Sequence, residues 1–108
     1  MAQITIDYGS VSGGTVSEEL TETKQWGAST SWVTNSAMNT SVEIGKTYII
    51  SSVSNGTVSD ISVDGLEMSS KAVGSAFAIK GVATKTTLTL TTTGGSFIPS
   101  RVCVAKLE

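Results

Sequence analysis

The chain has 108 residues and a net charge of −2, with 15% charged residues and 33 serine or threonine residues. This length supports one domain with its own core. The seven Lys and Arg residues are scattered singly, which excludes the basic surface that nucleic-acid binding needs.

Other missing features narrow the class of protein further. No apolar run approaches the roughly 18 residues of a membrane-spanning helix, and the N-terminal residues lack the basic and apolar regions of an export signal. The single cysteine, Cys103, excludes an intramolecular disulfide, and we interpret it as a small core or sheet residue. We therefore expect a soluble protein that is made in the host cytoplasm and has no membrane partner.

The first predicted strand covers residues 2–8. Ile4, Ile6 and Tyr8 alternate there with polar residues, which is typical of a half-buried strand. A short alternating strand can complete the unpaired edge of another sheet by main-chain pairing. We therefore assign Ile4, Ile6 and Tyr8 as candidate assembly residues.

A flexible tether, GSVSGG at residues 9–14, follows this strand. We divide the chain into an N-terminal strand with its tether, residues 1–14, and a β-sandwich domain, residues 15–108. The tether allows the strand to pair within its own domain or to reach a neighbouring subunit as an exchanged arm. The sequence leaves both arrangements open.

Residues 15–26 are ambiguous between helix and strand. Thr15 and Glu18 have the spacing of a helix capping box, whereas the apolar residues of the segment share strand parity. The threonine content favours a strand, and the charges favour an edge strand. Another short strand is predicted to begin at Trp32 and Val33.

The strongest local pattern lies between residues 46 and 71, after a predicted loop at residues 36–41. Strands are predicted near residues 46–54, 57–63 and 66–71. Asn55-Gly56 and Asp64-Gly65 separate them, and such pairs favour type I′ hairpin turns with positive φ. We therefore predict a three-stranded antiparallel meander.

Further strands are predicted at residues 75–82, 85–93 and 97–107, at a spacing of about ten residues. Regular short strands without a convincing helix indicate an all-β fold, an antiparallel β-sandwich or jelly roll. The predicted core consists of Ile4, Ile6, Trp32, Tyr48, Ile50, Ile61, Val63, Phe77, Ile79, Leu88, Leu90, Val102 and Val104.

The sequence offers little for catalysis or for cofactor binding. It contains no histidine, the commonest general base and metal ligand. Gly45-Lys46-Thr47 resembles part of a phosphate-binding loop, but the glycine required upstream is replaced by Thr40. Asp60 and Asp64 are too few for calcium, and we assign them to turns. We expect no catalytic residues, no cofactor and no metal.

Trp26 and Trp32 are the remaining candidates for a binding site. Two exposed indole rings on one surface would make a platform for stacking against sugar rings. Large aromatic residues also dominate small cores, and we favour burial over a glycan platform.

Three segments carry a family resemblance: GKTYIIS at residues 45–51, FAIKGVATKTTLTLTTTGGSF at 77–97 and RVCVAKLE at 101–108. They resemble the second half of carbohydrate-binding-module jelly rolls, which also occur in phage tail, fibre and capsid-associated proteins. The resemblance implies a jelly-roll sandwich with either a sugar-binding or a virion role. Before the last strand, where family members carry acidic residues, this chain has Pro99, Ser100 and Arg101, so no calcium is expected there.

These observations favour a non-enzymatic, bacteriophage-type virion structural protein that decorates a capsid or forms part of a tail or fibre. We expect it to reside in the virion and to associate with other virion proteins and with itself, for example as a trimer. The alternative is a small carbohydrate-binding module that binds a glycan through Trp26 and Trp32. A second alternative, an enzyme, is disfavoured by the composition.

Overall fold

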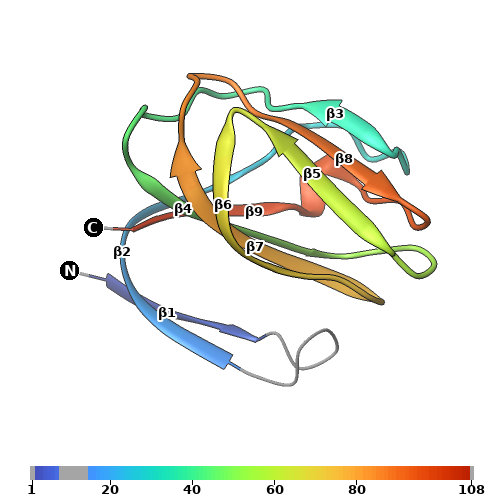
Figure 1. The fold of residues 1–108 in the computed structure, drawn as a ribbon, viewed down its shortest axis with the longest axis horizontal. Helices are drawn as coiled ribbons and strands as arrows, with labels where there is room; N and C mark the ends of the chain where they lie inside the picture. Colours follow the sequence, from blue (N-terminus) through green and yellow to red (C-terminus); the bar gives the residue numbers. More distant parts are fainter. Residues whose placement is uncertain (1, 8–14, 108) are drawn as a thin grey trace.

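The computed structural model describes the backbone of residues 2–7 and 15–107, and the side chains of residues 24–107. The described residues form nine strands and one 3-10 helix, η1 (Figure 1). Strands dominate because β-branched residues suit a pleated surface, and glycines separate many of them. The elements are β1 (Ala2–Asp7), β2 (Thr15–Gln25), β3 (Asn35–Ala37), β4 (Thr47–Val53), β5 (Asp60–Asp64), β6 (Leu66–Ala72), β7 (Ala76–Ala83), β8 (Thr89–Thr93), η1 (Pro99–Arg101) and β9 (Cys103–Leu107).

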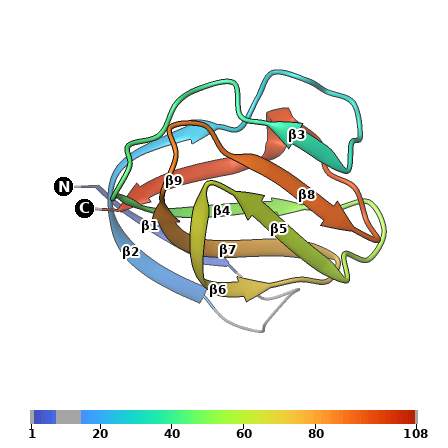
Figure 2. The ribbon, with the colours of Figure 1, turned by 45° about the horizontal axis from the view of Figure 1, so that its top comes forward.

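The strands form two antiparallel sheets that pack face to face (Figures 1 and 2). The large sheet has the order β1-β2-β9-β4-β7-β6, and the small sheet has the order β3-β8-β5. All pairs of neighbouring strands are antiparallel. The predicted all-β antiparallel sandwich is therefore confirmed.

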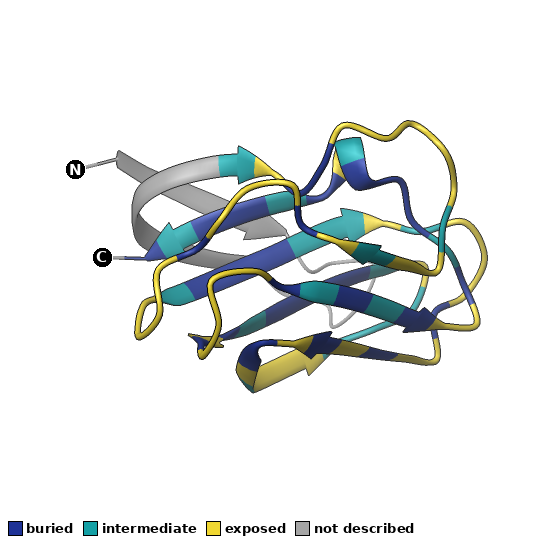
Figure 3. Cartoon of the chain, turned by 90° about the horizontal axis from the view of Figure 1, so that it is seen from above, coloured by how far each residue is buried: buried dark blue, intermediate teal, exposed yellow. Residues whose placement is uncertain are grey.

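The core lies between the two sheets. Residues of β5 alternate between exposed and buried, whereas three successive residues of β4 and of β7 are buried (Figure 3). Phe77 and Phe97 meet edge to face, with ring centroids 6.2 Å apart. Ten of the predicted core residues are buried: Tyr48, Ile50, Ile61, Val63, Phe77, Ile79, Leu88, Leu90, Val102 and Val104.

The predicted meander is wrong. β4 pairs with β7 and β9, β6 pairs with β7, and β5 belongs to the small sheet with β8. Gly56 and Gly65 do have positive φ, 81° and 92°. Asn55 and Asp64 do not, and a type I′ turn needs positive φ at both central residues. The glycines instead mark places where the chain leaves a strand, and Gly65 connects β5 of the small sheet to β6 of the large sheet.

Three strand assignments also need correction. The segment 15–26 is mainly a strand, as favoured, but it is not an edge strand because β1 and β9 lie on either side of it. Val33 makes only an isolated bridge, to Phe97, and β3 begins at Asn35, partly within the predicted loop. The last predicted strand is interrupted at η1, where Pro99 lacks the N–H that a continuous ladder needs.

β2 pairs with a different strand along each half of its length. Residues 15–20 pair with β1, and residues 20–25 pair with β9. The register shifts between Leu20 and Glu22, and a bulge of this kind bends a strand. β1 and the first half of β2, hereafter the N-terminal hairpin, lie on the side of the large sheet opposite the small sheet (Figures 1 and 2).

Candidate functional site

The two tryptophans differ in exposure and do not form a common platform. Trp26 follows β2, has no exposed surface and belongs to the core. Its backbone N–H donates to the Val102 carbonyl at 2.9 Å, and its carbonyl accepts from the Asn39 N–H at 3.0 Å. Trp32 lies in the loop before β3, and 44% of its surface is exposed. Burial is therefore confirmed for Trp26 and wrong for Trp32, and the platform that used both rings is corrected.

Trp26 has one unusual feature for a core residue. Within the described part of the chain, its buried indole N–H has no hydrogen-bond partner. A buried donor without a partner costs about 1–3 kcal/mol of folding free energy. Burial of the large ring therefore stabilises the fold in spite of a polar penalty.

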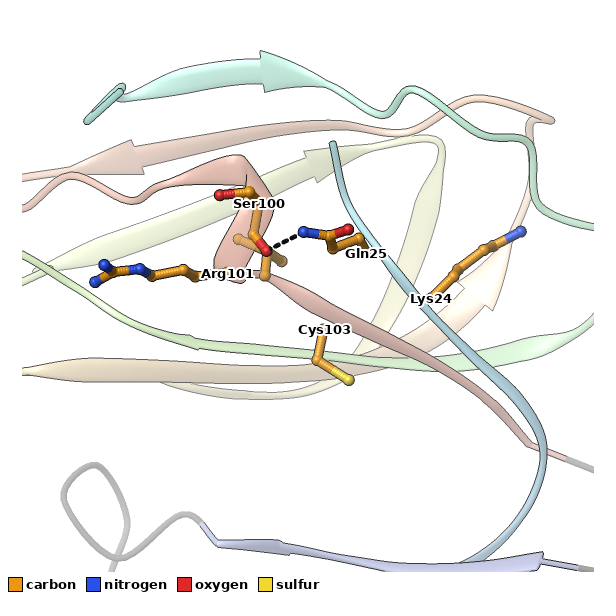
Figure 4. Close-up of a pocket in the computed structure, with 6 residues that line it drawn as sticks. Lys24, Gln25, Ser100, Arg101 and Cys103 are labelled. Atoms are coloured by element: carbon orange, nitrogen blue, oxygen red, sulfur yellow. Dashed lines mark hydrogen bonds between the residues drawn. The ribbon is translucent and has the colours of Figure 1, made fainter. Parts of the chain in front are cut away.

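A shallow opening of about 230 Å³ lies where β2 meets η1 and β9. It is lined by Lys24, Gln25, Ser100, Arg101, Val102 and Cys103 (Figure 4). The Gln25 side chain donates to the Ser100 carbonyl, whereas the Lys24 and Arg101 side chains extend in opposite directions. The two cations therefore do not converge on one ligand position.

Cys103 lies on β9, lines this opening and is half-buried. Burial raises the pKa of its thiol. The thiolate is the nucleophilic form of cysteine, so a raised pKa lowers its reactivity near neutral pH. The prediction that Cys103 is a small sheet residue is confirmed by its position in β9.

The carboxylates singled out in the sequence form exposed ion pairs. Asp60 pairs with Lys71 at 2.7 Å, and Asp64 pairs with Lys85 at 2.8 Å. The hydrogen bond from Lys71, with a second from the Ile61 N–H, lowers the pKa of Asp60. In the described part of the chain, no three His, Cys, Asp or Glu side chains cluster so that they could hold a metal ion.

A third ion pair joins Glu43 to Lys106 at 2.6 Å, and its hydrogen bond and charge lower the pKa of Glu43. A lowered carboxyl pKa stabilises the fold above the pKa of the unfolded chain, and this contribution is lost as acid protonates the group. The Lys106 side chain is only 17% exposed, but the carboxylates of all three pairs are exposed to water, which screens such pairs and keeps their contribution to stability small. We therefore interpret the three ion pairs as surface interactions and do not assign them to a binding site.

The candidate assembly residues Ile4 and Ile6 lie on β1, which pairs antiparallel with β2 of the same chain. Their side chains, and Tyr8 as a whole, lie outside the described part of the chain. The structure therefore gives the strand position of Ile4 and Ile6, and their role in assembly stays a prediction.

Comparison with known proteins adds no family to these observations, because no family model, curated protein or solved structure matches the chain. No helix among the described residues has the length and apolar character needed to cross a bilayer.

Sequence reasoning missed one feature of the large sheet. Ile49 and Ala105 are completely buried but do not belong to the core cluster between the sheets. The signal was present, because Tyr48-Ile49-Ile50 is a continuous apolar run, and such runs are typical of strands covered on both faces.

Proposed function

We propose that this protein is a non-enzymatic structural component of a bacteriophage-type virion, which acts by associating with copies of itself and with other virion proteins. The observation that carries the proposal is the N-terminal hairpin. β1 occupies the edge of the large sheet and pairs there with β2. An edge strand offers unpaired backbone N–H and C=O groups to a neighbouring chain.

The hairpin also needs a surface to pack on. Two-stranded hairpins are marginally stable by themselves in water. In the described strand pairs, hairpin residues 2–7 and 15–20 pair with each other, and Leu20 alone among the hairpin residues also pairs with β9. Packing against further protein, from the same chain or from another, would stabilise them.

The surface composition supports an assembly role as well. Serine and threonine account for 33 residues, whereas charged residues account for 15% of the chain. Burying a hydroxyl at an interface costs less desolvation free energy than burying a charge. This composition suits a domain with much of its surface in contact with other subunits.

Sedimentation velocity of the full chain over a wide concentration range tests the proposal. We expect species heavier than one chain, and their fraction should rise with concentration by mass action. A single species with the mass of one chain at every concentration would count against an assembly role.

A carbohydrate-binding module is the second candidate, and the exposure of Trp32 favours it. An exposed indole can stack against a sugar ring. In that case the wild type should bind on a glycan array, and Trp32→Ala should lose the signal while its thermal unfolding stays unchanged. If neither protein gives a signal, the glycan alternative is excluded for the sugars on the array.

A further inference from the structure

The outer face of the large sheet, which points away from the small sheet, has an apolar centre. Ile49 lies between Tyr48 and Ile50, which belong to the core cluster, so strand alternation places Ile49 on the opposite face. Ile49 is paired with Ala105 of β9 on one side and with Lys80 of β7 on the other. Paired residues share a face, so these three side chains form one row across the outer face.

This apolar centre is covered. Ile49 and Ala105 have no exposed surface, and Ala78, also outside the core cluster, is only 4% exposed. In a two-layer sandwich the outer face of a sheet normally contacts water. An isoleucine between an alanine and a lysine loses all of its exposed surface only if more of the chain lies over it.

The N-terminal hairpin lies on that side of the large sheet. Figures 1 and 2 agree in this placement, and Figure 4 shows the Cys103 side chain projecting toward the side where β1 runs. Cys103 is two residues from Ala105 on β9 and therefore shares its face. The outer face around Ile49 and Ala105 and the hairpin thus lie on the same side of the large sheet.

Hairpin and sandwich have opposite charge. Residues 2–20 contain Asp7, Glu18 and Glu19 and no Lys or Arg, which gives a net charge of −3. The rest of the chain contains all seven Lys and Arg residues and the other six acids, which gives a net charge of +1. Opposite charges steer the two parts together whether they belong to one chain or to two.

The bulge between Leu20 and Glu22 supplies a hinge. It separates residues 15–20, which pair with β1, from residues 22–25, which pair with β9, and Leu20 pairs with both strands. A change of backbone conformation at this point would redirect the hairpin and keep every described strand pair except Leu20 with Leu107. Exchange of an identical element between copies costs little, because the contacts made between chains replace the same contacts within one.

We propose that the outer face around Ile49 and Ala105 receives the N-terminal hairpin of a second copy of this chain, in exchange for its own. The inference rests on the proposed assembly function and names its interface. The partner is a second copy for two reasons. Its hairpin and hinge are the same, so the two chains can exchange hairpins, and its sandwich carries the positive charge that complements the negative hairpin.

Cross-linking to the native Cys103 tests the exchange. The variant Ile4→Cys combined with Cys103→Ser is mixed with wild type, unfolded and refolded together, and treated with a short bismaleimide. Only a hairpin seated on the other chain can then join residue 4 to Cys103. We expect a covalent heterodimer in the assembled fraction, and Ile6→Cys with Cys103→Ser repeats the test at a second hairpin position.

Two controls define the background. Wild type alone reports links between two Cys103 thiols, and Thr57→Cys with Cys103→Ser places the new thiol in the exposed loop between β4 and β5. Neither control should give the heterodimer.

The remaining outcomes contradict the inference in distinguishable ways. If Ile4→Cys in a chain that keeps Cys103 links only within itself while the protein is assembled, the hairpin stays on its own sandwich and exchange is wrong. If neither hairpin variant links to Cys103 in any combination, although a monofunctional maleimide labels Cys103 in the same samples, the outer face is not the hairpin surface. If no assembled fraction exists, the proposed function fails together with the exchange.

Discussion

Replacing Trp26 with Ala is expected to lower the free energy of unfolding by roughly 3–5 kcal/mol, the range for removing a large buried aromatic side chain. The ring has no exposed surface and packs in the core between the sheets. Because a domain of this size is stable by only about 5–15 kcal/mol, the variant should be largely unfolded well below the wild-type midpoint. Chemical denaturation monitored by circular dichroism measures the loss.

Two further variants make this result specific. Trp26→Phe should cost less than Trp26→Ala, because it keeps an aromatic ring and removes the indole N–H that lacks a partner in the described structure. Trp32→Ala should change stability by no more than about 0.5 kcal/mol, as expected of an exposed residue. Equal losses for Trp26→Ala and Trp32→Ala would contradict the assignment of one ring to the core and the other to the surface.

Replacing Gly81 with Val is expected to cost at least about 1–3 kcal/mol, the range for overpacking a filled interior. A Cβ at Gly81 would clash with the Glu67 carbonyl oxygen and would lie 2.9 Å from Leu66 Cγ. Both atoms belong to β6, and the oxygen is backbone, so β6 would have to move away from β7. The thermal midpoint should fall by on the order of 10 °C.

The matched control for this clash is Ser70→Val, which introduces the same residue at an exposed position of β6. It should leave the midpoint almost unchanged, because its side chain faces solvent. A similar small effect for Gly81→Val would mean that β6 and β7 are not held at the distance seen here.

The existence of the strands was predictable from the sequence because it depends on local composition and alternation. The alternation of apolar and polar residues correctly predicted that Ile61 and Val63 are buried, because β5 has one buried and one exposed face. The pairing of strands was not predictable in the same way. Asn55-Gly56 and Asp64-Gly65 indicate that the chain turns, but not whether the next strand stays in the same sheet.

The candidate site was less predictable for a related reason. Trp26 and Trp32 both lie near small polar residues, and their different burial depends on contacts with distant segments such as Val102 and Asn39. The outer face had a local signal in Tyr48-Ile49-Ile50. To predict what covers this face, one would have to know that β2 bends. The bend depends on the strands that pair with the two halves of β2, and the local sequence does not show them.

The central claim is that the N-terminal hairpin holds copies of this chain together, and light scattering of the full chain beside a chain lacking residues 2–9 tests it most directly. We predict a multiple of the 11.1 kDa chain mass for the full chain and a lower multiple, or one chain, for the shortened protein. The deletion should lower the association state strongly and the thermal midpoint of the shortened protein only slightly. Equal association states for the two proteins, or a full chain that is monomeric even at high concentration, would contradict the account.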